Sequence, residues 1–182
     1  MGRLLLCAAL LVSVGGCSLL PWNRAAEERR RQARNDALVR KMDHVVRSYL
    51  GTRYRLGGNS HKGIDCSGLL VRIYEAVGIR LPRTASAQYD VGRGADSDEL
   101  QYGDILFFNT KPLGRRTSCL FPGPMARADV PLIYGLTHSG MYVGRGRFVH
   151  ASSSSGVSYA HLDDEYWQDR FIGARRILDD FD

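Results

Sequence analysis

The sequence has no apolar run long enough for a membrane-spanning helix, which needs about 20 residues. Its longest apolar segment, residues 4–14, has only 11 residues. Basic residues interleaved with aromatic ones are absent, so the formal net charge of +6 does not indicate a nucleic acid as partner. Internal repeats and the H-E-x-x-H spacing of zinc proteases are absent as well. The 182 residues are enough for one domain with a hydrophobic core.

The N-terminal segment has the layout of a bacterial secretory signal. Arg3 precedes the apolar segment, and the small residues Gly15 and Gly16 lead into Cys17. The residues Val-Gly-Gly-Cys resemble a lipobox, which implies a diacylglycerol on the Cys17 sulfur and acylation of its new amino group. An ordinary signal peptide with a chance cysteine is the alternative. Ser18, rather than Asp, is similar to the outer-membrane sorting signal, which implies a lipid-anchored protein facing the periplasm of a Gram-negative cell.

We therefore divide the chain into a signal peptide, residues 1–16, a lipidated tether, residues 17–34, and one domain, residues 35–182. The basic stretch after Cys17 is interpreted as a solvated linker rather than as a lipid-binding patch. From Asn35 onward, apolar residues recur at helical spacing. They predict a helix that is capped by Asn35 or Asp36 and ends at Gly51.

The remaining pattern predicts helices first and strands afterwards. Apolar spacing favours a second helix from Cys66 to Gly78 and a shorter one over residues 86–91. Short β-rich runs follow at residues 104–108, 138–144, 147–152, 157–160 and 173–178. This order indicates an α+β fold. Residues 110–137, rich in proline, are predicted to be a wall or lid of the site, or else a floppy insertion.

Cys66 is the candidate nucleophile, because it stands at the start of a predicted helix. Unsatisfied N–H groups there are expected to lower the pKa of the thiol and to favour the reactive thiolate. Asp65 is placed to cap the helix, and Gly68 would allow another backbone to approach. The alternatives are a small buried residue and a disulfide with Cys119. The other two cysteines are excluded, since Cys7 leaves with the signal and Cys17 is lipidated.

Two of the five histidines are placed to assist a thiol. His138 and His150 belong to adjacent predicted strands, and a three-residue loop over residues 144–146 would pair Gly140 with His150. His138 is then the diagonal neighbour of His150 on the same face. A two-residue loop without a bulge would place them on opposite faces. We expect His138 to be the base and His150 to orient it.

Other assignments of the histidines are weaker. A zinc site formed by Cys66, His138 and His150 is the competing hypothesis, but no short ligand spacing supports it. The three other histidines are predicted to be surface or packing residues: His44, His61 and His161.

Several separated motifs resemble the NlpC family of bacterial cell-wall cysteine endopeptidases, and most of all its Spr-type outer-membrane lipoproteins. They are GTRYRLGG, with Tyr54, then DCSG around Cys66, LPRTASAQ, GDILFF, HSG at His138 and FVHAS at His150. The resemblance implies a papain-like fold in which the nucleophile helix packs on an antiparallel sheet. It assigns Cys66 as the nucleophile, His138 as the base and His150 as the third polar residue. Tyr54 matches the oxyanion side, and Asp65 and Ser67 match the substrate groove.

The same resemblance implies the reaction. The expected substrate is the stem peptide of peptidoglycan, cut at the D,D cross-link between diaminopimelate and D-Ala or, alternatively, between D-Glu and diaminopimelate. No metal or organic cofactor is expected, and we expect a monomer. Two other hypotheses remain open, an acyltransferase that uses the same residues and an inactive wall-binding lipoprotein.

Overall fold

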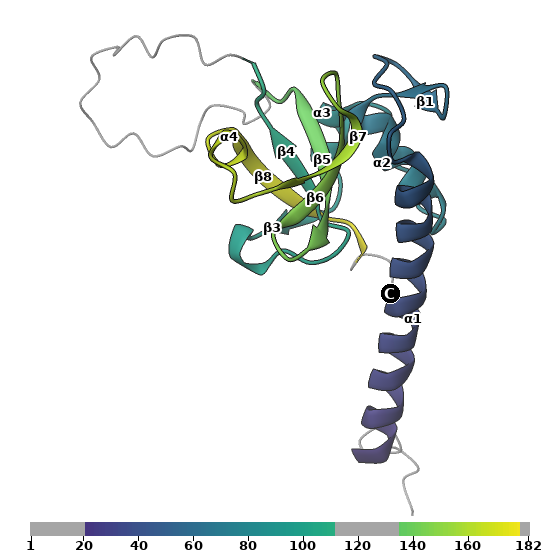
Figure 1. Ribbon diagram of the computed structural model, residues 1–182. Coiled ribbons are helices and arrows are strands. Elements are labelled where there is room, and N and C mark those ends of the chain that lie inside the picture. The colour runs from purple at the N-terminus through teal and green to yellow at the C-terminus, as the bar shows by residue number, and fades with distance from the viewer. Residues whose placement is uncertain (1–20, 112–134, 179–182) are drawn as a thin grey trace, which may run out of the picture. The chain divides into compact units, whose positions relative to one another are not determined.

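The computed structural model describes residues 21–111 and 135–178 (Figure 1). The predicted signal segment, Cys17, Cys119 and most of the predicted insertion lie outside these ranges. The chain divides into two compact units, Met1–Ala37 and Leu38–Asp182, and each is described by itself. Among the described residues, no helix has the length and apolar character needed to cross a bilayer.

The first helix, α1, runs from Pro21 to Tyr49. The predicted start at Asn35 or Asp36 is therefore wrong, because the helix continues through residues that we assigned to the tether. Those residues are mostly Ala, Glu, Gln and Arg, which have high intrinsic helix propensity, and Pro21 suits the first helical position. Residues with high helix propensity need no periodic spacing of apolar side chains. The apolar pattern therefore did not predict this first part of the helix.

The second unit is built on a six-stranded antiparallel sheet in the order β3-β8-β4-β5-β6-β7. The strands are β3 (Arg93–Ala95), β4 (Ile105–Phe108), β5 (His138–Gly144), β6 (Arg147–Ser152), β7 (Gly156–His161) and β8 (Phe171–Arg176). A separate pair is formed by β1 (Asn59–Ser60) and β2 (Gly63–Ile64). All five predicted strands are present, so the predicted α+β class is confirmed.

Three short helices complete the described part of the second unit: α2 (Cys66–Glu75), α3 (Ala85–Tyr89) and α4 (Glu165–Gln168). A single turn of 3-10 helix, η2, covers Ser97–Glu99. The predicted helices at 66–78 and 86–91 are confirmed as α2 and α3, each a little shorter than expected. Strand β3 and helix α4 were not predicted, because segments of three and four residues are too short to show a period.

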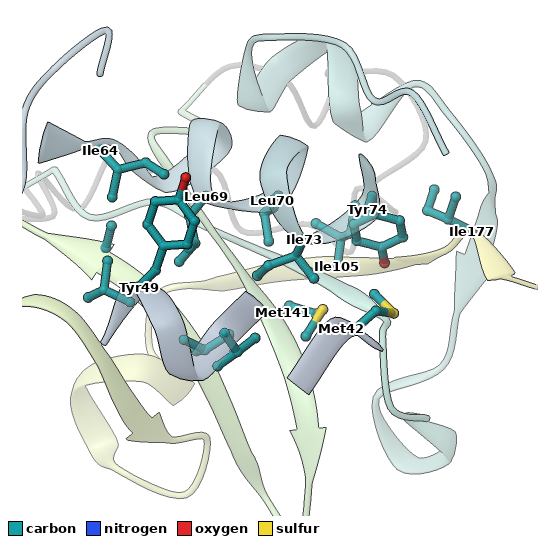
Figure 2. Close-up of a cluster of buried hydrophobic side chains, with 14 of the residues drawn as sticks. Met42, Tyr49, Ile64, Leu69, Leu70, Ile73, Tyr74, Ile105, Met141 and Ile177 are labelled. Atoms are coloured by element: carbon teal, nitrogen blue, oxygen red, sulfur yellow. The ribbon is translucent and has the colours of Figure 1, made fainter. Parts of the chain in front are cut away.

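The hydrophobic core holds α2 against the sheet (Figure 2). Leu69, Leu70 and Ile73 on one face of α2 are fully buried, and they pack with Ile105 of β4 and Met141 of β5. Burial of each such side chain contributes about 1.5–3 kcal/mol to stability. The buried part of α1 adds three further side chains to the same cluster: Met42, Val46 and Tyr49. This packing fixes the start of α2 next to the start of β5.

The β5–β6 hairpin has the predicted register but a different turn. Gly140 pairs with His150, as expected. Arg145 and Gly146 form a two-residue turn, and both have the positive φ angles, +56° and +69°, that match the twist of paired strands. The register shifts between Tyr142 and Gly144. This bulge inserts the extra residue that the predicted three-residue loop would have supplied, so both histidines still lie on one face.

Candidate active site

Cys66 is the first residue of α2, and Asp65 caps the helix as predicted. The Oδ1 atom of Asp65 accepts a hydrogen bond from the N–H of Gly68 at 2.7 Å, and its Oδ2 atom accepts one from the N–H of Gly57 at 2.8 Å. The cap therefore joins the helix to the turn that follows Tyr54. The backbone N–H of Cys66, in the first turn, has no partner within the helix.

Gly68 allows the close approach that its position suggested. A Cβ atom on Gly68 would lie 2.5 Å from the carbonyl oxygen of Gly58 and 2.9 Å from the Asp65 carboxylate. Only glycine fits such a contact, because the nearest atom belongs to a backbone that cannot rotate away. The turn at Gly58, and with it Tyr54, is thereby held beside Cys66.

The thiol of Cys66 is free and buried, with 8% of its surface exposed. Burial raises the pKa of the thiol above its ordinary value, and the negative charge of Asp65 adds to the effect. The N–H groups of Ser139 and Ser67 act in the opposite direction but do not outweigh burial. The expected lowering of the thiol pKa by the helix terminus is therefore wrong. Cys66 rests as a neutral thiol and needs a base.

Ser139, which was not predicted as a site residue, contacts the Cys66 thiol. Its backbone N–H and, more weakly, its hydroxyl stabilise the Cys66 thiolate. The Oγ atom is buried and makes no fixed hydrogen bond among the described residues, so the N–H is the firmer donor. Ser139 directly follows His138 on β5, so the strand that carries the candidate base passes beside the Cys66 thiol. The sequence feature that could have indicated Ser139 is its position within the motif His138-Ser139-Gly140.

His138 and His150 form the predicted pair. The Nε2 atom of His138 lies 2.9 Å from the Nδ1 atom of His150, and the ring planes are nearly perpendicular at 86°. Since Nε2 is engaged with His150, a base at His138 would have to use Nδ1, which must then be unprotonated. The proton of His138 then sits on Nε2 and is donated to Nδ1 of His150. In this arrangement His150 orients the ring and can stabilise an imidazolium.

Both imidazoles are uncharged at neutral pH. Burial lowers the pKa of His138 to about 3, with a further contribution from the charge of His150, and burial lowers the pKa of His150 to about 4. The exposed fraction of His138 is 7%, and that of His150 is 5%. At rest, the thiol of Cys66 and the two imidazoles are therefore all uncharged.

The buried pair makes stability depend on pH. The unfolded chain protonates each imidazole below about pH 6.5, whereas the folded protein does so only near the lowered pKa values, so stability falls as the pH drops from about 6.5 to 4. Each imidazole contributes a slope of up to about 1.4 kcal/mol per pH unit. We expect the slope, measured by urea unfolding at several pH values, to become smaller in His150→Asn. The exposed His161→Asn is the control, and an equal slope in all three proteins would contradict the assignment.

A cavity of about 570 Å³ lies in front of Cys66. It is lined by the three remaining predicted site residues, Tyr54, Asp65 and Ser67, together with Leu56, Gly57, Arg83, Thr84, Ala85 and Thr137. Burial raises the pKa of Tyr54, and the nearby charges of Cys66 and Asp65 raise it further. Tyr54 therefore keeps its O–H as a hydrogen-bond donor beside the thiol. A cavity of this size accommodates a peptide segment.

Arg83, which belongs to the LPRTASAQ motif but was not predicted as a site residue, binds two other residues that line the cavity. Its guanidinium donates to both carboxylate oxygens of Asp65, at 2.9 and 2.8 Å, and to Oγ of Ser67 at 3.0 Å. Burial acts to raise the pKa of Asp65, but the bonds from Arg83, Gly68 and Gly57 outweigh it and lower the pKa. Asp65 is therefore held as a carboxylate.

Other candidates are separated from this site. His44, His61 and His161 are exposed, as predicted, and His61 stacks on Tyr49 at 3.9 Å. In residues 21–111 and 135–178, no three His, Cys, Asp or Glu side chains converge as metal ligands would.

The predicted insertion reaches the site at one end. Thr110 and Thr137, its first and last residues, are bonded through their hydroxyls at 2.9 Å, and the N–H of Thr110 donates to Oγ1 of Thr137 at 2.7 Å. Thr137 also lines the cavity. Residues 112–134 lie outside the described ranges, so the predicted wall or lid stays a prediction.

Comparisons with known proteins identify relatives of this chain. The NlpC/P60 family matches residues 51–119 and 127–176. The murein DD-endopeptidase MepS/murein LD-carboxypeptidase of Escherichia coli K12 is 36% identical over 144 residues, 79% of this chain and 64% of that relative. The probable endopeptidase NlpC of the same organism is 34% identical over 96% of this chain and 97% of its own length.

A solved structure supports the same assignment. An NLP/P60 family protein of Staphylococcus aureus Mu50, described as similar to a lipoprotein, has a TM-score of 0.60 and 34% sequence identity. The match covers 78% of this chain and 42% of that protein. The predicted papain-like architecture, with a nucleophile helix on an antiparallel sheet, is confirmed, and the chain belongs to the NlpC/P60 family.

Proposed function

We propose that the protein is a cysteine peptidase that cuts amide bonds in the stem peptides of peptidoglycan. One observation carries the proposal: the Cys66 thiol lies against Ser139, and the adjacent His138 is hydrogen-bonded to His150 at 2.9 Å. A neutral nucleophile, a base with one free nitrogen and an orienting group are what thiol catalysis requires. The substrate class comes from the murein endopeptidases to which the chain is similar.

The mechanism follows from the protonation states. Nδ1 of His138 takes the proton of Cys66 as the sulfur attacks the amide carbonyl, and His150 stabilises the imidazolium that forms. The O–H of Tyr54 and the backbone N–H of Cys66 would donate to the tetrahedral oxyanion, which is supported by the position of both residues in the lining of the cavity. His138 then protonates the leaving amine, and water activated by the same imidazole hydrolyses the thioester.

Within this substrate class, we propose the D,D cross-link between diaminopimelate and D-Ala as the bond that is cut. The support is the murein DD-endopeptidase MepS, 36% identical over 79% of this chain. Cleavage between D-Glu and diaminopimelate is the second candidate. Incubation with purified cross-linked and uncross-linked muropeptides, followed by chromatography and mass spectrometry, separates them. Dimers converted to monomers support the first bond, and shortened monomers support the second.

The two rival functions predict other products. An acyltransferase would form a thioester on Cys66 and pass the acyl group to an added amine without cutting cross-linked stems. A wall-binding protein would retain muropeptides and change none of them. Unaltered muropeptides under reducing conditions, with the native protein, would therefore exclude the proposed hydrolysis.

Tyr54→Phe tests the oxyanion assignment. Removal of one donor from an oxyanion site lowers kcat by about 100- to 1,000-fold. We expect a loss of this order with little change in KM, because the hydroxyl acts on charge that exists only in the transition state. Tyr166→Phe removes a hydroxyl from an exposed tyrosine on α4 and is the matched control. A rise in KM with kcat unchanged would instead assign Tyr54 to ground-state binding of the substrate.

We further propose that Cys17 is lipidated and that the protein is an outer-membrane lipoprotein, acting as a monomer and facing the periplasm. The support is the signal-like segment that ends at Cys17 and the adjacent Ser18. Several acyl chains hold a protein at a bilayer, at about 0.8 kcal/mol per buried CH2. Labelled palmitate should be incorporated into the native protein and not into Cys17→Ala, which should fractionate as soluble. Incorporation into both would exclude Cys17 as the site.

A further inference from the structure

Trp167, a residue that the reaction does not use directly, contacts both catalytic imidazoles. It lies on α4, and its indole stacks on His138 with ring centroids 5.6 Å apart and an angle of 25° between the planes. The same indole meets His150 edge-on, at 4.9 Å and 80°. Trp167 thus touches the two rings whose mutual hydrogen bond defines the base.

The indole also separates the pair from solvent. None of the α4 residues is buried, and Trp167 itself is half-buried, whereas His138 and His150 are almost completely buried. The layer between the imidazoles and water on this side is therefore the indole. Aromatic stacking of this kind fixes ring orientation and contributes about 0.5–1.5 kcal/mol beyond area burial.

The short helix that carries Trp167 is held by contacts that do not involve the indole. The backbone N–H of Trp167 donates to the carbonyl of Asp164, and that of Asn109 donates to the carbonyl of Arg170 at 2.8 Å. The guanidinium of Arg170 lies 4.0 Å from the centre of the Tyr166 ring. Replacement of the indole should therefore leave the path of the backbone in place.

We propose that Trp167 is a positioning residue that acts through His138 and His150: its indole fixes the ring orientation in which they hydrogen-bond, and it excludes water from them. This inference rests on the proposed role of the two histidines. The competing explanation is simple packing, since Trp167 also contacts Phe108 and Phe148 in the second hydrophobic cluster.

The charges near the pair determine what loss of the indole should do. The titratable group that faces His138 is His150, to which it is hydrogen-bonded. The charged groups around α4 are Arg170 and the exposed carboxylates of Asp164, Glu165 and Asp169. Without the indole, water would solvate the charged forms of the imidazoles and the carboxylates would stabilise them. Protonation of the pair should then occur at higher pH.

The test compares Trp167→Ala and Trp167→Phe in the full-length protein. Phe171→Ala is the matched packing control, because Phe171 belongs to the same cluster and packs on Phe108, at 5.8 Å, without a ring contact to either histidine. Histidine ring signals, labelled with carbon-13 and assigned with His→Gln variants, report protonation by NMR as the pH is lowered. The same proteins are assayed for kcat and KM on cross-linked muropeptides, and their unfolding midpoints are measured.

In Trp167→Ala we expect the protonation of the pair to move upward by about one pH unit. Misplacement of the base should lower kcat by about 10- to 100-fold with KM little changed. Trp167→Phe should keep kcat and the protonation of the pair close to those of the native protein. Phe171→Ala should lower the unfolding midpoint without the protonation shift. The proposal is overturned if Trp167→Ala titrates like the native protein, or if Phe171→Ala shifts the pair equally. Because the titration needs no substrate, it remains decisive even if the native protein hydrolyses no muropeptide.

Discussion

Replacement of Cys66 by alanine is expected to lower the rate of muropeptide hydrolysis by about 10,000-fold or more, because removal of a nucleophile from a catalytic set leaves only substrate binding and oxyanion stabilisation. The Cys66 sulfur is the only atom removed, and it lies at the first turn of α2 rather than in the middle of the core. The fold should therefore remain. The measurement is the initial rate at saturating substrate, with enough enzyme to detect residual turnover.

A structural role for Cys66 would give a different result. If the thiol were merely packed, Cys66→Ala would lower the unfolding midpoint and leave kcat within a few fold of the native value. Ser139→Ala is a useful comparison. It alters a neighbour of the thiol but keeps the backbone N–H that is the firmer donor to the thiolate, so it should lose far less activity than Cys66→Ala.

Replacement of His138 by alanine is the second large effect. The Cys66 thiol has a raised pKa and is neutral at rest, so it cannot attack efficiently without a base. Loss of the base should lower kcat by about 10,000-fold, close to the loss of the nucleophile itself, because the two act as a unit. Raising the assay pH should restore part of the activity, since a larger fraction of the Cys66 thiol is then deprotonated without the base. The measurement is kcat between pH 6 and 10.

Comparison with His150 separates the roles of the two rings. His150→Ala should lower kcat less than His138→Ala does. The base remains in this variant, and only the interaction that orients it and stabilises its charged form is lost. His150→Asn keeps a hydrogen-bonding side chain and should recover part of the loss, while the exposed His161→Ala should be unaffected. Equal losses in His150→Ala and His138→Ala, both unresponsive to pH, would show that the assignment of base and orienter is wrong.

The placement of the candidate catalytic residues could be predicted where it depends on short-range geometry. The register of the β5–β6 hairpin follows from the number of residues between His138 and His150, and a bulge preserved it although the turn was not the expected one. The cap by Asp65 is likewise set by a neighbour in sequence, since its carboxylate accepts from the N–H of Gly68. In these places local chain geometry decides where a side chain lies.

Other features depend on contacts that sequence spacing does not report. The raised thiol pKa reflects burial under β5, and it reversed the expectation based on the helix terminus. Arg83 and Trp167 reach the site from segments that are distant in sequence, and α4 is too short to have a period. The early start of α1 was missed for another reason: intrinsic propensity extends a helix without apolar spacing.

The central claim is that Cys66 becomes covalently attached to the acyl half of its substrate. The most direct test quenches the native protein with acid during turnover of a cross-linked muropeptide and maps its peptides by mass spectrometry. We expect an acyl group on the peptide that contains Cys66, released by hydroxylamine as expected for a thioester. Steady product formation with Cys66 unmodified at every quench time, or an acyl group on any other residue, would contradict it.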